Sequence, residues 1–324
     1  MTEFEYKTIV IDSKETEHSE KSLSDKLNHY GKGRLGAGYL FRLSVYRQLP
    51  IFSYRNRTES NSDIQKAAMP QKGGGRMTNA VEVRHLSKSI EGSPILNDIC
   101  MNVRQGEVYG FLGANGAGKT SLMKTLYHII FPDTGTVCLL GETINKGNNP
   151  VFSRIGSIIE SPVFYSHLSA YENMELHCRY MGAGYENIME TLSLLGIAET
   201  GKKAVGKFSL GMKQRLALAR AMLTKPDLLI LDEPINGLDP QGIIEVRELL
   251  LRINHEYHTS ILISSHILDE LSKIADTIGI IDHGAMLAEV SMKELTAKGI
   301  DLETYYLGLL GGGEKNVEPY PHGN

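Results

Sequence analysis

The pattern of apolar and polar positions becomes regular at about residue 79. From there on, short apolar runs alternate with longer segments whose apolar residues have helical spacing. The short runs predict strands, and strands that alternate with helices favour an α/β fold with a parallel sheet. The predicted strands are 80–84, 94–103, 107–112, 136–140, 227–231, 260–264 and 277–281. The predicted helices are 121–130, 170–181, 185–195, 212–223, 242–255 and 268–275.

The middle of this region has a different character. Residues 151–223 carry mostly helical patterns, which predicts a helical subdomain of about 155–225 inserted into the α/β core. The core resumes at 227–231, a continuous apolar run of the kind found in central parallel strands.

Residues 1–76 do not share this order. Their patterns predict a strand at 4–11, a helix at 20–30 and a Gly-rich linker at 71–76. We expect a poorly defined extension with the pattern of a truncated strand–helix domain or a fusion, followed by a second domain over 77–324. The stretch 26–58 is basic and rich in aromatic residues, which suits either contact with RNA or anionic lipid or a solvated segment.

One glycine-rich stretch of the second domain fits G-x-x-x-x-G-K-[ST], the phosphate-binding loop. A predicted strand precedes it and a predicted helix follows, which is the context that the motif requires. Glycines let the backbone curl around an anion, and the amide groups at the helix start then face the phosphates. Lys119 supplies a mobile positive charge, and the Thr120 hydroxyl suits Mg²⁺. The nucleotide-binding residues predicted here are Gly113, Ala114, Asn115, Gly116, Ala117, Gly118, Lys119, Thr120 and Ser121.

A pair of carboxylates follows the predicted strand 227–231. Ligands of open α/β sheets bind beyond the carboxyl ends of the strands. We therefore expect Asp232 to hold Mg²⁺ and Glu233 to orient the water that attacks the γ-phosphate, as a general base.

A third element stands at the start of the predicted helix 212–223. Ser209 and Gly211 lie where a hydroxyl, backbone amides and the helix dipole can address an anion, although alone they also suit an ordinary capped helix. Together the three elements resemble the ATP-binding cassette (ABC) family over roughly 79–310. The family signature Leu-Ser-Gly-Gly-Gln is matched at Ser209 and Gly211, with Leu210 and Met212 as departures.

Smaller motifs extend the resemblance. Asp239, in Asn-Gly-Leu-Asp-Pro, matches the loop that crosses the dimer interface in the family, and His266 matches the histidine that contacts the γ-phosphate. The resemblance implies a RecA-like P-loop NTPase core with a parallel sheet and a helical insertion. It also implies ATP and Mg²⁺ as ligands.

Two positions depart from the family pattern. Glu160 stands where the family usually has a glutamine; a carboxylate there can still take a Mg²⁺-bound water, but it adds negative charge beside the phosphates. Ile90 stands where the family stacks adenine on an aromatic ring, so that contact becomes a plain apolar one.

Glu160 together with the segment 208–212 narrows the resemblance to ATPase subunits that export bacitracin and lantibiotics. The chain contains one cassette, so the resemblance implies an ATP-bound dimer with a second copy. It also implies a separate membrane permease docked near 160–172. The expected function is ATP hydrolysis that drives export of antimicrobial peptides or drugs, and so antibiotic resistance, at the inner face of the cell membrane.

Composition limits the alternatives. The net charge of −4 gives no nucleic-acid signal, and the three widely spaced cysteines suit reduced thiols in the cytosol. We find no apolar run long enough for a spanning helix and no signal-peptide core. A soluble ABC ATPase acting on ribosomes or nucleic acid has only the basic stretch 26–58 in its favour. A P-loop kinase or GTPase is disfavoured by the signature helix and by the absence of an Asn-Lys-x-Asp motif.

Overall fold

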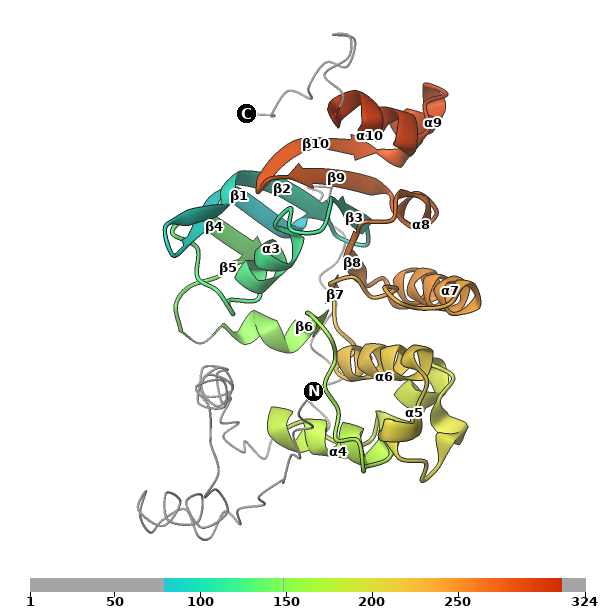
Figure 1. Ribbon diagram of the computed structural model, residues 1–324. Coiled ribbons are helices and arrows are strands. Elements are labelled where there is room, and N and C mark those ends of the chain that lie inside the picture. Colours follow the sequence, from blue (N-terminus) through green and yellow to red (C-terminus); the bar gives the residue numbers. More distant parts are fainter. Residues whose placement is uncertain (1–78, 148, 311–324) are drawn as a thin grey trace, which may run out of the picture. The chain divides into compact units, whose positions relative to one another are not determined.

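The computed structural model describes residues 79–147 and 149–310 (Figure 1). The expectations for 1–76, including the basic stretch, lie outside these residues and stay untested. Within the described range, no helix has the length and apolarity needed to cross a membrane.

The core is a six-stranded sheet in the order β10-β9-β3-β8-β7-β6 (Figure 1). Five strands run parallel, and β10 pairs antiparallel with β9 at one edge. All four residues of β7 and all six of β8 are buried, as expected for central strands covered on both faces. The strands are β3 (Val108–Leu112), β6 (Ile155–Ile158), β7 (Leu228–Leu231), β8 (Ser260–Ser265), β9 (Thr277–Asp282) and β10 (Ala285–Ser291).

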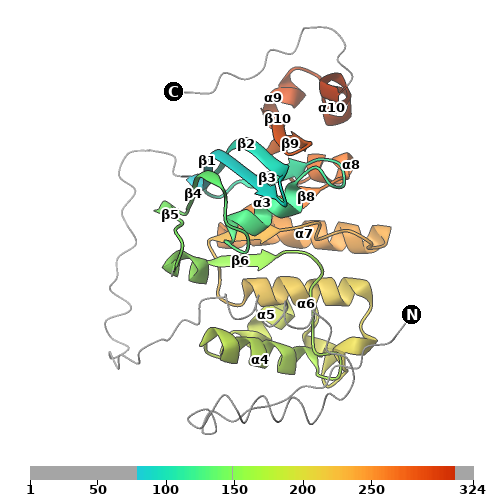
Figure 2. The same ribbon diagram turned by 60° about the vertical axis from the view of Figure 1, so that its left-hand side comes forward.

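A second, antiparallel sheet has the order β2-β1-β4-β5. Helix α3 (Lys119–Leu126) packs between the two sheets, because its buried Leu122, Met123 and Leu126 share one core cluster with apolar residues of both (Figure 2). This packing fixes the phosphate-binding loop, which leads directly into α3. The strands are β1 (Asn79–Ile90), β2 (Ser93–Arg104), β4 (Thr134–Leu139) and β5 (Glu142–Thr143).

Helices cover the other face of the main sheet. Leu229 and Leu231 of β7 share a second core cluster with buried residues of α7 (Pro240–Tyr257) and α8 (Leu268–Ser272), whereas Leu228 and Ile230 belong to the cluster around α3. The strand is therefore apolar on both sides, which explains the unbroken run in the sequence.

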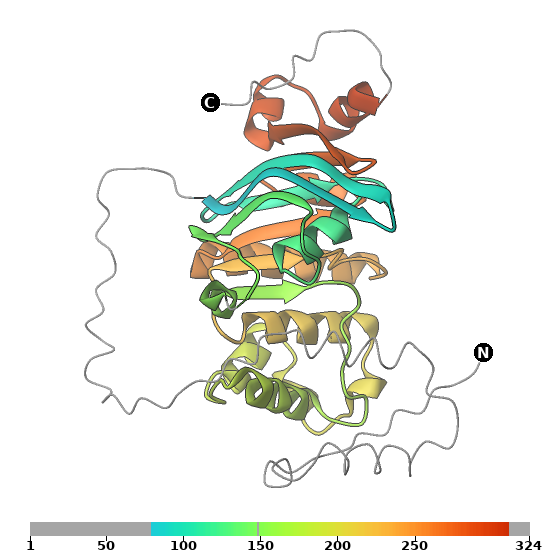
Figure 3. The same ribbon diagram turned by 90° about the vertical axis from the view of Figure 1, so that its left-hand side faces the viewer.

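The helical block lies beyond the β6 edge of the sheet (Figure 3). It comprises α4 (Ala170–Met181), α5 (Ile188–Leu194) and α6 (Leu210–Met222), with short 3₁₀ turns at Ala198–Thr200 and Val205–Lys207. Ser169 and Glu172 form a reciprocal capping box at the start of α4. The backbone of α6 packs closely on β6, because a Cβ added to Gly156 would lie 2.2 Å from the Ala221 carbonyl oxygen.

The predicted subdomain boundary at residue 155 is wrong in one respect. Residues 155–158 form β6, a parallel strand of the core that pairs with β7, so the helices begin only at Ala170. The strand Ile-Gly-Ser-Ile is short and follows the 3₁₀ turn Pro150–Arg154, so no periodic pattern marks it. The sequence pattern also gave no prediction of four further elements: β5, β10, α9 (Met292–Ala297) and α10 (Leu302–Leu310).

Candidate functional site

The glycines of the loop after β3 hold it in a shape that other residues would not accept. Gly116 and Gly118 have φ of 85° and 111°, in the left-handed region. A Cβ on Gly113 would lie 2.5 Å from the Ile281 carbonyl oxygen. Gly118 is also the N-cap of α3, so the loop presents its amides at a helix start, where an anion is favoured.

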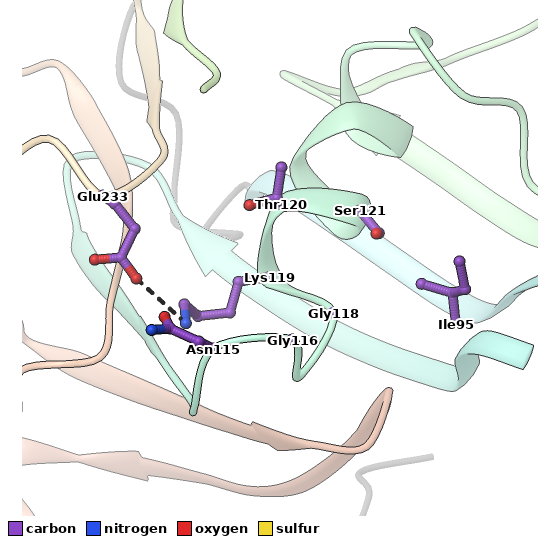
Figure 4. Close-up of a pocket in the computed structure, with 8 residues that line it drawn as sticks. All are labelled: Ile95, Asn115, Gly116, Gly118, Lys119, Thr120, Ser121 and Glu233. Carbon is purple, nitrogen blue, oxygen red and sulfur yellow. Dashed lines mark ion pairs between the residues drawn. The ribbon is translucent and has the colours of Figure 1, made fainter. Parts of the chain in front are cut away.

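Lys119 joins this loop to the end of β7. The side chain is 5% exposed. Its Nζ donates to the carbonyl oxygens of Gly113 at 2.7 Å and Ala114 at 3.1 Å. It also lies 3.2 Å from Oε1 of Glu233, the contact drawn in Figure 4. The positive charge is thus positioned above the loop and balanced by a carboxylate.

Asp232 is the centre of a hydrogen-bonded network. Its Oδ2 accepts from the Thr120 hydroxyl at 2.7 Å, and its Oδ1 accepts from the Ser264 hydroxyl at 2.7 Å. The Ser264 oxygen in turn accepts from the Glu233 backbone N–H at 2.9 Å. The start of α3 and the ends of β7 and β8, far apart in sequence, are therefore tied together at one edge of the sheet.

Glu233 occupies a strained position. Its φ is 47°, which is uncommon for a residue with a side chain and is often found at functional sites. Oε2 lies 2.9 Å from Nδ1 of His266. Oε1 is buried and, among the described residues, has the ion pair with Lys119 but no hydrogen bond. A buried carboxylate oxygen with unused acceptor capacity is suited to bind a water molecule.

A pocket opens over the loop, between Glu233 and the start of α3 (Figure 4). It combines backbone amides, a lysine, hydroxyls and one apolar side chain. The lining residues are Ile95, Asn115, Gly116, Gly118, Lys119, Thr120, Ser121 and Glu233.

These groups fit a triphosphate and a divalent cation. The glycine cradle and Lys119 suit a polyanion. The oxygens of Thr120 and Asp232 are hard ligands of the kind that Mg²⁺ selects. The unused acceptor on Glu233 adds a place for a water molecule.

Several predicted residues do not reach this pocket. Ser209 is the N-cap of α6, where its hydroxyl accepts from the Met212 N–H at 3.2 Å. Asp239 caps α7 and accepts from the Gly242 N–H at 3.0 Å. Neither these residues nor Gly211 line the pocket within the described chain.

The two departures from the family pattern have contacts of their own. Glu160 has a φ of 62° and forms an ion pair with Lys124, which lies one helical turn after Thr120 on α3. Ile90 is 40% exposed at the end of β1, and Ile95 lines the pocket in its place.

Three contributing residues were missed by the sequence analysis. Ile95 follows Ile90 by one hairpin turn, and the pocket lining shows that Ile95 is the one beside the loop. Lys124 was detectable as a cation four residues after Thr120, on the same helix face. The link that Ser264 makes between Asp232 and Glu233 depends on β7 and β8 being neighbours.

Comparison with known proteins places this geometry in a family. The sequence model described as "ABC transporter" matches residues 96–236. An uncharacterized ABC transporter ATP-binding protein, YcbN of Bacillus subtilis (strain 168), is 48% identical over 228 residues, covering 69% of this chain and 74% of that protein.

Two further relatives have named transport roles. The bacitracin transport ATP-binding protein BcrA of Enterococcus faecalis is 43% identical over 220 residues, covering 68% of this chain and 71% of its own. The lantibiotic transport ATP-binding protein SrtF of Streptococcus pyogenes is 42% identical over 209 residues, covering 64% of this chain and 90% of that protein.

A solved structure of an ATP-binding subunit of an ABC transporter superposes with a TM-score of 0.62 at 28% identity, covering 71% of this chain and 99% of that one. The resemblance to the family, the fold class and the ATPase activity are thereby confirmed. The chain belongs to the ATP-binding proteins of ABC transporters, which hydrolyse ATP to drive transport.

Proposed function

We propose that this chain drives the export of peptide antibiotics of the bacitracin or lantibiotic kind, together with a separate membrane permease. The identities of 42–43% to the bacitracin and lantibiotic transport proteins support this substrate class. Glu160 accords with it, since this residue is one of the features that link the sequence to that group of exporters.

The observation that carries the ATP-driven part of the proposal is the meeting of two motifs, the phosphate-binding loop and the carboxylate pair, at one pocket. Lys119 lies 3.2 Å from Glu233, and Thr120 donates to Asp232 at 2.7 Å. The loop amides and Lys119 would hold the β- and γ-phosphates of ATP. Thr120 and Asp232, with Glu160 in support, would hold Mg²⁺, which when bound neutralises phosphate charge during hydrolysis.

Glu233 is proposed as the general base and His266 as its positioning partner and a contact for the γ-phosphate. The Lys119–Glu233 ion pair has a consequence for the order of events. Phosphates compete with Glu233 for the charge of Lys119, so ATP binding would release Oε1 to accept a hydrogen bond from the attacking water. His266 stays on Oε2 and keeps the carboxylate oriented.

A second copy would complete the site. Ser209, Gly211 and Asp239 lie outside the pocket lining of their own chain, and the intervening Leu210 is 51% exposed. In the proposed head-to-tail dimer, these residues approach the nucleotide held by the other copy, and Ile90 and Ile95 border the base. ATP thus favours the closed dimer, and hydrolysis favours the open one.

We also propose a domain boundary between residues 76 and 77. We place the cassette over 77–324, with β1 as its first strand, and leave 1–76 as a separate extension. The cassette would act peripherally at the cytoplasmic face of the membrane, with the permease near residues 160–172.

Transport is tested in a sensitive strain that expresses the full chain together with the membrane protein encoded by the adjacent gene. We expect the inhibitory concentration of bacitracin or a lantibiotic to rise, and that of an unrelated antibiotic such as an aminoglycoside to stay unchanged. Glu233→Gln should abolish the protection while ATP binding persists. If ATP is hydrolysed but protection against both peptides is absent, the proposed substrate class is wrong and the ATPase assignment stands.

A further inference from the structure

A group of metal-ligand side chains lies on the antiparallel sheet, outside the nucleotide pocket. It consists of His85 on β1 with Asp98 and Cys100 on β2. One ligand atom from each residue lies within 4.8 Å of the other two. His85 and Asp98 are exposed and Cys100 is half-buried, so a metal ion from solvent has access.

The strand register places the three side chains on one face. Leu86 pairs with Ile99, and both are fully buried against the core. Side chains alternate along a strand, so the neighbours His85, Asp98 and Cys100 all point to the opposite, solvent face. The shared face is therefore a result of the pairing.

The distances between ligand atoms suit a tetrahedral ion. The Nδ1 atom of His85 lies 2.9 Å from Oδ1 of Asp98 and 3.8 Å from Sγ of Cys100. Zinc bonds of about 2.0–2.3 Å at tetrahedral angles separate neighbouring ligand atoms by roughly 3.3–3.6 Å. Small side-chain rotations would bring both contacts to these values.

The backbone around the three residues is irregular, and this irregularity turns their side chains towards one another. His85 and Asp98 have φ of 50° and 49°, and the β1–β2 register shifts between Val83 and Leu86. Bulges of this kind redirect side chains. Strand β4 packs against the bulge, since a Cβ on Gly135 would lie 2.4 Å from the His85 carbonyl oxygen.

The sulfur already has a supporting contact. The His85 backbone N–H donates to Sγ of Cys100 at 3.2 Å, and the Asp98 N–H donates to the Ser87 hydroxyl at 3.0 Å. An amide donor stabilises a thiolate, and outer contacts of this type orient metal ligands.

From this arrangement we propose that His85, Asp98 and Cys100 bind one Zn²⁺ ion, with water as the fourth ligand, clamping β1 to β2. Thiolate, imidazole and carboxylate together favour zinc over magnesium or calcium. Binding releases the thiol proton of Cys100 to solvent. Nothing in this proposal depends on the transport function.

The chain offers matched controls. The exposed His283 and the half-buried Asp282 form a similar pair, with 2.8 Å between Nδ1 and Oδ2 and a positive φ at His283, but the three-ligand group found in the described range does not include them. Cys138 is a half-buried cysteine on the neighbouring β4 and is not part of the group.

The test uses the full, reduced chain freed of metal and titrated with Co²⁺ and with Zn²⁺. Co²⁺ should give the thiolate-to-metal charge-transfer band at one equivalent, and Zn²⁺ should bleach it. Cys100→Ser should abolish the band, and His85→Ala should weaken Zn²⁺ binding by about 10-fold or more. Cys138→Ser and His283→Ala should behave as the unmodified chain does.

Circular dichroism establishes that each variant is folded, and a melting experiment gives a second readout. Zn²⁺ should raise the melting temperature of the unmodified chain and of Cys138→Ser, but not of Cys100→Ser. A charge-transfer band that persists in Cys100→Ser, or the absence of any band in the unmodified chain, would overturn the proposal.

Discussion

The hydroxyl of Ser264 links the two carboxylates of the candidate site, and its removal should have a large effect. Ser264 is fully buried, donates to Oδ1 of Asp232 at 2.7 Å and accepts from the Glu233 N–H at 2.9 Å. Loss of a hydrogen bond to a charged group costs about 1.5–3 kcal/mol, and a buried donor left unpaired costs about 1–3 kcal/mol more. Ser264→Ala should therefore lower the free energy of unfolding by about 3–5 kcal/mol.

Ser265 supplies a matched control. It is equally buried, but among the described residues its oxygen accepts one hydrogen bond, from the Ile267 N–H at 3.0 Å. One neutral hydrogen bond is worth about 1 kcal/mol, so Ser265→Ala should be much milder. The chain has no tryptophan, so urea unfolding is followed by circular dichroism.

The same variants separate structural from functional effects. Without the Ser264 hydroxyl, Asp232 loses one of the two hydrogen bonds that its carboxylate accepts from Thr120 and Ser264. Ser264→Ala should therefore bind ATP about tenfold more weakly in the presence of Mg²⁺, and nearly as well as the unmodified chain in its absence. Calorimetry at a temperature below the unfolding midpoint of the variant measures both affinities. Equal stabilities for the two alanine variants, together with unaltered Mg²⁺-dependent binding, would show that Ser264 does not hold the two carboxylates in place.

Three further perturbations test other parts of the structure. Burial, with a neighbouring arginine, lowers the pKa of His177 to about 4 from 6.5. As the pH falls, the unfolded chain therefore binds the proton first, so a stabilisation of about 3 kcal/mol should be present above pH 6.5 and vanish towards pH 4. In His177→Gln, the free energy of unfolding in urea should vary less with pH across that window. Lys124→Met should weaken Mg²⁺-ATP binding about two- to fivefold at low salt, because the charge of Glu160 would lose its partner beside the proposed phosphate site. A second change, Glu160→Gln, should restore binding, and failure to restore it would show that this ion pair does not affect the nucleotide. Gly113→Ala should destabilise the fold by about 1–3 kcal/mol and abolish ATP binding, because its Cβ would lie 2.5 Å from the Ile281 carbonyl oxygen. In Gly308→Ala the added Cβ has no neighbouring atom within 4 Å, so this variant should melt no lower than the unmodified chain.

The sequence predicted the phosphate-binding loop and the parallel core well, for a local reason. A glycine loop between an apolar strand and a helix is defined within a few residues, and β7 is apolar on both faces. The structure begins α3 at Lys119 and ends it at Leu126, with His128 at a φ of 55° just beyond, whereas apolar spacing had suggested 121–130.

Features that depend on distant pairing were not predictable. Strand β6 has four residues and no alternation, and it is a strand only because β7 lies beside it. The Thr120–Asp232–Ser264 network joins the ends of three elements, and periodicity carries no information on such neighbours. The roles assigned to Glu160, Ser209, Gly211, Asp239 and Ile90 remain predictions.

A crystal structure of Glu233→Gln with ATP and Mg²⁺ would show directly whether two copies share the nucleotide. Two copies should enclose two nucleotides, each triphosphate lying against the amides of 113–120 and Lys119 of one copy and against Ser209 and Gly211 of the partner subunit. A triphosphate bound elsewhere, or enclosed by a single chain alone, would rule out a nucleotide site shared between two copies.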